Sequence, residues 1–271
     1  MLKIRKSAVL LVVVGLAAFN VEASPRRKAA PINQVQTSVS DVQANSSPLD
    51  GRLEIEPSLG FAFLSPKDVN TAIHDTNDSY QQQGVKSFNI PDIGSSFGFG
   101  GTVTYRVAPT FALGLGVNRL SSSSDGSAKV GNNSMNGTVG IGATLLTVET
   151  HITLTRSRNQ AFEILFSPSA GIAFFQESSQ FGGSALNMPT EVNTSSTGAV
   201  FGGTFGMRYW IVRNVAWNLN LGYRYAKSGD LRVDSQRNTN DSVGSIFERG
   251  GKKVNVDASA MVLATGLTWS L

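Results

Sequence analysis

The sequence predicts an all-β fold: a closed, eight-stranded antiparallel transmembrane β-barrel with long external loops and a short helix in the first loop. Three observations predict it. Eight segments alternate apolar with small or polar residues at a period of two, as β-strands do. The connections between them alternate long and short, as in a barrel with tight turns at one membrane face and extended loops at the other. Gly, Ser, Thr and Asn fill much of the second face and suit the narrow lumen of an eight-stranded barrel. The eight segments are 53–63, 97–107, 111–118, 138–154, 161–175, 199–210, 215–226 and 254–271.

The residues before the first strand have two parts. Residues 1–23 combine a basic start, the apolar run AVLLVVVGLAAF and small residues at the end, which predicts a secretory signal peptide cleaved after Ala23. A membrane-spanning helix would need about 20 apolar residues, and this run is shorter. Residues 24–52 are polar and lack apolar periodicity, so we expect a flexible periplasmic tail. Residues 53–271 then form the barrel domain.

The composition excludes several classes of function. The 271 residues contain no Cys, which excludes a disulfide scaffold, thiolate metal sites and a Cys nucleophile. Only two His are present, so we expect no metal site, and nothing in the sequence predicts a cofactor. The formal net charge of +4 is small, and half of it belongs to the signal peptide. We therefore expect no binding of nucleic acid.

The first strand and the connection after it illustrate the pattern. In 53–63 the odd positions are apolar, or Pro at 57, and the even positions are small or charged. After it, Ser65 as N-cap, Pro66, Asp68 and Gly84 are start and stop signals for a helix. This short amphipathic helix is expected either to cover the external mouth or to lie on the lipid surface.

The later elements follow the same two rules. The segments 97–107 and 111–118 place aromatic and aliphatic residues opposite Gly and Thr, and 215–226 shows the clearest alternation. The stretches 121–137 and 180–197 are rich in Ser, Gly and Asn and are predicted to be external loops.

The aromatic residues predict where the membrane lies. All three Trp lie beside short turns or at the C-terminus, hence at one interface. The predicted periplasmic girdle contains Tyr105, Phe111, Tyr209, Trp210, Trp217 and Trp269. The predicted external girdle contains Phe63, Phe97, Phe174 and Tyr225.

Three segments give the chain a family resemblance: GMRYWI before a short turn, WNLNLGYRYA after it, and the terminal VDASAMVLATGLTWSL. Through them, residues 53–271 resemble the OmpA/OmpX-like superfamily of eight-stranded outer-membrane barrels. The resemblance implies the outer membrane of a Gram-negative bacterium and assembly by the outer-membrane assembly machinery. It implies no single role, because such barrels include structural proteins, adhesins, small pores and enzymes. Members usually end in Phe or Trp, whereas this chain ends in Leu271.

Four charged residues fall on the lumen face near the periplasmic end. Glu54 and Glu56 begin the first strand, Arg106 ends the second, and Arg208 lies near the end of the sixth. We expect an ion-pair network that plugs the lumen, because unpaired charges in a narrow barrel are costly. A charged lining of a small water-filled pore is the alternative. Arg224 lies further towards the external end and is expected to be separate.

No catalytic residues are predicted. The local sequence His151-Ile152-Thr153 resembles the His-x-Ser arrangement of lipid A deacylase barrels, but it has Thr in place of Ser and falls towards the periplasmic end. His74 lies in the loop helix without a nucleophile at fixed spacing. The sequence thus favours a monomeric, non-enzymatic outer-membrane protein with a structural or surface-interaction role. Its predicted partners are outer-membrane lipid and a surface ligand of the external loops. A small passive porin and a lipid A-modifying enzyme are the alternatives.

Overall fold

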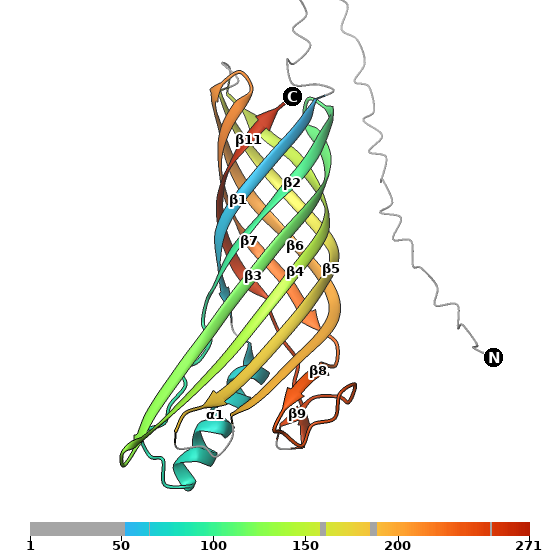
Figure 1. The fold of residues 1–271 in the computed structure, drawn as a ribbon. Helices are drawn as coiled ribbons and strands as arrows, with labels where there is room; N and C mark the ends of the chain where they lie inside the picture. The colour runs from blue at the N-terminus through green and yellow to red at the C-terminus, as the bar shows by residue number, and fades with distance from the viewer. Residues whose placement is uncertain (1–51, 65, 158–160, 185–188, 250) are drawn as a thin grey trace, which may run out of the picture. The chain divides into compact units, whose positions relative to one another are not determined.

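The computed structural model describes residues 52–64, 66–157, 161–184, 189–249 and 251–271. The predicted signal peptide and periplasmic tail lie outside these residues, apart from Arg52. In the described chain, eight antiparallel strands form a closed ring, as predicted. Each strand pairs with the next, and the last pairs with the first (Figure 1). In ring order the strands are β1 (Leu53–Leu64), β2 (Ser96–Ala108), β3 (Phe111–Val130), β4 (Asn133–Arg156), β5 (Phe162–Gly182), β6 (Thr190–Val212), β7 (Val215–Ser228) and β11 (Ala260–Ser270).

The two ends of the ring differ. At the end near the C-terminus, short turns join β2 to β3 and β6 to β7. At the opposite end lie the helix α1 (Lys67–Gln82) and the short strands β8 (Arg232–Arg237), β9 (Glu248–Arg249) and β10 (Lys252–Lys253) (Figure 1). Outer-membrane barrels have short turns on the periplasmic side, so α1 and β8 mark the external end.

The external ends of the strands extend further than predicted. The stretch 121–137 is not a loop: β3 runs to Val130 and β4 starts at Asn133, with a tight turn in which Gly131 has a φ of +62°. Likewise β5 and β6 take up much of 180–197, and the final strand begins at Ala260 rather than at 254. The polar outer face of these extensions hides their strand character in the sequence, because hydrophobic periodicity is missing there.

The polar and apolar faces of β4 change sides between its two halves. In the periplasmic half of β4 the inward side chains are polar and the outward ones include Leu146 and Val148, which are exposed. In the external half the inward side chains are apolar and buried, namely Met135, Val139, Ile141, Ala143 and Leu145. The outward residues between them are Asn, Thr and Gly. The periplasmic half therefore has the faces of a membrane barrel, and the external half those of a water-soluble one.

The external half of the lumen is filled by one apolar cluster, which we call the external plug. It joins inward side chains of the barrel, such as Leu145 and Phe175, to Val69 and Ile73 of α1 and to Phe247 beside β9. Phe175 is completely buried, and its ring lies against Gly198 on the neighbouring strand, where a Cβ atom would come within 3.0 Å of it.

Helix α1 covers the external mouth rather than lying on lipid. Asn77 clamps the chain that follows the helix, because its amide donates to the carbonyl of Ile90 and accepts from the amide of the same residue. Gly84, just past the helix, has a φ of +92°, consistent with the predicted stop. At the start, Ser65 lies outside the described residues, and Pro66 occupies the N-cap position without a side-chain cap.

Candidate functional site

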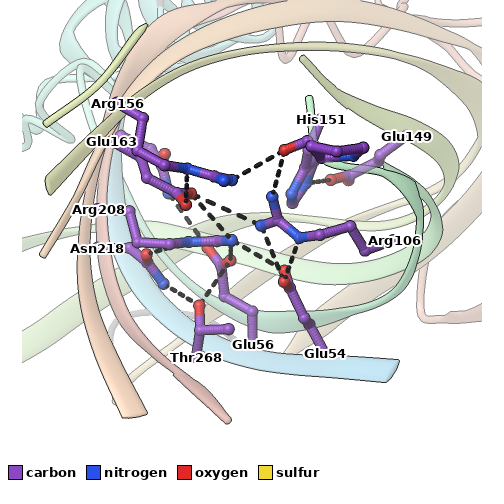
Figure 2. Close-up of polar contacts among 12 residues, drawn as sticks. Glu54, Glu56, Arg106, Glu149, His151, Arg156, Glu163, Arg208, Asn218 and Thr268 are labelled. Carbon is purple, nitrogen blue, oxygen red and sulfur yellow. Dashed lines mark hydrogen bonds and ion pairs between the residues drawn. The ribbon is translucent and has the colours of Figure 1, made fainter. Parts of the chain in front are cut away.

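The candidate site is a buried network of charged side chains in the periplasmic half of the lumen (Figure 2). Glu54 and Glu56 are two residues apart on β1 and so share one face, and their burial identifies it as the inward face. Arg106 of β2 and Arg208 of β6 also lie at buried, inward-facing positions of their strands. The structure brings all four side chains together, although 152 residues separate Glu56 from Arg208 in the chain.

Arg208 is the centre of the network. Its Nη1 donates to Glu54 Oε2 at 2.8 Å, and its Nη2 donates to Glu56 Oε2 at 3.0 Å. Its Nε donates to Asn218 Oδ1 at 3.0 Å. The side chain is 1% exposed, and Glu54 is equally buried. Such a planar fork matched to two carboxylates is a geometry that arginine provides and lysine does not.

Arg106 completes the other side of Glu54. Its Nε and Nη2 both lie 2.9 Å from Glu54 Oε1, so this carboxylate is shared by two guanidinium groups. Its Nη1 donates to the carbonyl of Pro109 in the periplasmic turn at 3.2 Å. The network is thereby tied to the backbone that closes the periplasmic end.

Sequence reasoning missed four further members. Glu163 of β5 is completely buried and lies 2.9 Å from Arg156 and 3.6 Å from Arg106. Asn218 and Thr268 extend the network, since Asn218 donates to Thr268, whose hydroxyl donates to Glu56 at 3.2 Å. Three carboxylates thus face three guanidinium groups, and the formal charge of the six is zero. The signal for Glu163 was its position near the periplasmic start of a strand, like that of Glu54.

The aromatic residues predicted for the periplasmic girdle divide into two groups. Tyr105, Tyr209, Trp217 and Trp269 are exposed on the outer face, and Phe111 is partly exposed there. Trp210 is different: it is 8% exposed, points into the lumen and has Arg208 Cζ 5.8 Å from its ring centroid. Its placement in the girdle was wrong because its neighbours Tyr209 and Ile211 already occupy the outward phase. Phe63, Phe97, Phe174 and Tyr225 are all exposed on the outer face.

A cavity of about 110 Å³ lies within the lumen and is lined mainly by polar side chains. Glu149 and His151 line it, with Glu149 Oε2 3.9 Å from His151 Nε2. Arg224 also lines it, and its Nε and Nη2 have no hydrogen-bond partner among the described residues. Arg224 is therefore separate from the charged network. In the described part of the chain no group of three or more acidic or His side chains is placed to hold a metal ion.

Comparison with known proteins places this geometry in context. No protein-family model matches the chain, and no curated protein sequence does. Solved structures do match. The outer membrane protein OprG from Pseudomonas aeruginosa is 14% identical, covering 83% of this chain and 98% of that one with a TM-score of 0.42. A major outer membrane protein from Thermus thermophilus is 14% identical, covering 81% and 99% with a TM-score of 0.39. Ail, the attachment invasion locus protein of Yersinia pestis, is 9% identical, covering 82% and 99% with a TM-score of 0.36.

The fold of the described chain is a closed β-barrel of eight antiparallel strands. The outer membrane protease OmpT from Escherichia coli also matches, at 7% identity with a TM-score of 0.28. A fold by itself assigns no activity. The structure itself supports a place in the bacterial outer membrane, because its ring is closed and has an even number of strands. Between the two sets of exposed aromatic residues, its outer face carries exposed apolar side chains, such as Leu115, Val148 and Phe205. No helix in the described residues is long and apolar enough to cross a membrane.

Proposed function

We propose that the protein is a non-enzymatic outer-membrane barrel with a closed lumen, whose role is structural or is exerted through its external surface. The observation that carries this proposal is the burial of the four residues at the centre of the charged network. Arg106, Arg208, Glu54 and Glu163 are each at most 1% exposed. A water-filled pore would leave such groups hydrated, whereas here each guanidinium group faces carboxylates directly.

The external plug supports the same conclusion independently. It fills the other half of the lumen with apolar side chains that include Leu145, Phe175 and Val200, each completely buried. An ion would have to lose its hydration to pass them. The two closures differ in chemistry and lie in series, so opening one of them leaves the lumen closed.

The two His residues support the absence of catalysis. His151 faces Glu149 inside the lumen and is buried there, 7% exposed. His74 lies on α1, 3.1 Å from Asp92. Neither residue has a hydrogen bond to a Ser or Thr hydroxyl in the described part of the chain, so neither forms a nucleophile and base pair. The lipid A-modifying alternative therefore has little geometric support.

Planar-bilayer conductance tests the proposal. Refolded protein whose gel mobility shifts on boiling is expected to show no ion-conducting openings. Two variants each relieve one closure: Glu54→Ala with Arg208→Ala removes a balanced pair from the network, and Leu145→Ser with Phe175→Ser thins the external plug. Each double variant is expected to remain silent, and only their combination is expected to conduct. Reproducible openings of the folded wild-type barrel would contradict the closed lumen and favour the passive pore.

A further inference from the structure

Arg119 of β3 is an outward-facing cation whose role nothing described so far explains. Arg119 of β3 is the first polar residue beyond the outward run Phe111, Leu113, Leu115 and Val117. It therefore lies at the external edge of the apolar band, at the depth where the headgroups of outer-leaflet lipids begin. Cations at such an edge meet the charged part of the lipid.

The guanidinium group of Arg119 is held in one orientation. Its Nη1 donates to Thr144 Oγ1 at 2.7 Å, and its Nη2 donates to Gln176 Oε1 at 3.0 Å. Between these two contacts the group passes over Gly142, where a Cβ atom would lie 3.3 Å from Nη2. The side chain is thus laid across β4 towards β5, and the glycine leaves room for it.

The charge of Arg119 is not neutralised within the protein. Its two hydrogen-bond partners are a hydroxyl and an amide, and the described residues contain no carboxylate within ion-pair distance of it. This differs from the arginines of the charged network, each of which faces a carboxylate. A fixed, unneutralised guanidinium group is suited to a phosphate oxygen.

Beyond Arg119 the outer wall of the barrel forms a trough of about 450 Å³. Apart from Arg119 and two carboxylates, Glu177 and Asp234, its lining is uncharged and rich in hydroxyl and amide groups, as saccharides require for hydrogen bonding. The outward-facing members include Ser121, Ser123, Thr138, Gln176, Ser178 and Asn193, with Gly140 and Gly142 between them. Asp234 is at the far edge, on β8, about 19 Å from β3 by strand spacing.

We propose that Arg119 and this trough bind the phosphorylated saccharide headgroup of an outer-leaflet glycolipid. The phosphate lies against the guanidinium group of Arg119, and the sugars extend along the hydroxyl-lined wall away from the membrane. The inference rests on the orientation of the barrel but not on the closed lumen. A conducting barrel would still present this surface, so failure of either proposal is distinguishable from failure of the other.

Thermal unfolding in vesicles of defined composition tests the site. The barrel is refolded in phosphatidylcholine alone or with a bisphosphorylated lipid A, and unfolding is followed by the loss of its gel mobility shift. We expect the lipid A to raise the Tm of the wild type by about 5 °C. Arg119→Gln is expected to lose at least half of this rise while matching the wild-type Tm in phosphatidylcholine. Lys129→Gln is the matched control, because Lys129 faces outward on the same strand but lies about 33 Å further along it, towards its external end.

Two further arms identify the source of the phosphate. Lipid A from which the phosphates have been removed, and inorganic phosphate added to phosphatidylcholine vesicles, are both expected to leave the Tm unchanged. An equal rise for Arg119→Gln and the wild type would overturn the proposal, as would an equal rise with the dephosphorylated lipid. A matching rise with inorganic phosphate alone would overturn the assignment to a lipid. If Arg119→Gln does not refold, Arg119→Lys carries the test, with a reduced rise expected because the planar fork is lost.

Discussion

Replacement of Arg208 by Met is expected to destabilise the barrel by about 3–5 kcal/mol, the usual cost of removing one partner from a buried ion pair. Met fills much of the same volume but leaves Glu54 and Glu56 without their shared guanidinium group. Glu54 retains Arg106, whereas Glu56 retains only neutral donors, Asn220 and Thr268. The loss is therefore expected to come mainly from the stranded carboxylate of Glu56.

Urea unfolding of the refolded barrel in vesicles, followed by Trp emission, measures the effect. A second substitution, Glu56→Gln in the Arg208→Met background, is expected to restore part of the loss because it removes the stranded charge. Arg224→Met is the matched control: Arg224 has two guanidinium nitrogens without a partner among the described residues, so its removal is expected to leave stability unchanged or raised. A loss below about 1 kcal/mol for Arg208→Met would refute the reasoning, because the network would then be solvated.

Three further outcomes follow from the fold. Ile73→Ala on α1 is expected to cost about 2–5 kcal/mol locally, since Ile73 is 1% exposed, and hydrogen exchange should quicken in 67–93 but not in the periplasmic halves of the strands. Leu115→Arg on the outer face is expected to cost about 2–4 kcal/mol in urea unfolding, whereas Ser123→Arg on the same strand should cost under about 0.5 kcal/mol. Burial raises the pKa of Glu177, which lies beyond the apolar band on β5 and accepts hydrogen bonds from Ser179 and Thr194. A raised pKa means that the folded state binds the proton more tightly, so the stability of the external plug is expected to fall as pH rises from the ordinary carboxyl range through the raised value. Glu177→Gln should flatten that fall in hydrogen-exchange protection of β8, and a fall that persists in this variant would assign it to another group.

The strands in the membrane were predictable because lipid-facing apolar residues alternate with lumen-facing polar or small residues along each of them. The inward phase of β1 alone places Glu54 and Glu56 in the lumen, and the same count places Arg106 and Arg208 opposite them. Glu163 was harder to recognise, because the run from Phe162 to Phe166 contains apolar residues on both faces. Leu165, which points inward among them, breaks the alternation of polar and apolar residues that marks the inward face.

The strand extensions were not predictable from periodicity. In 121–130 the inward residues are Ser122, Ser124, Gly126 and Ala128, which carry no hydrophobic signal. These small residues are required because the interior there is filled from elsewhere in the chain. A Cβ atom on Gly126 would lie 2.4 Å from the carbonyl oxygen of Asn89 and 2.7 Å from a side-chain carbon of Ile90. The apolar side chains that bury this wall thus come from the segment after α1, and one strand read alone shows only half of the packing.

The position of the charged network depends on which half of the barrel is surrounded by lipid and which by water. Where lipid surrounds the barrel, the outer face supplies the apolar contact, and the inward residues are free to be polar provided that each charge finds a partner. Where water surrounds the barrel, the outer face is polar, and the interior must supply the apolar contact that stabilises the wall. The charged network therefore lies in the periplasmic half of the lumen and the external plug in the external half. Arg119 lies on the outer face at the boundary between its apolar and polar parts. The height of the membrane on this barrel is accordingly marked twice, once by the outward side chains and once by the change of the lumen from charged to apolar.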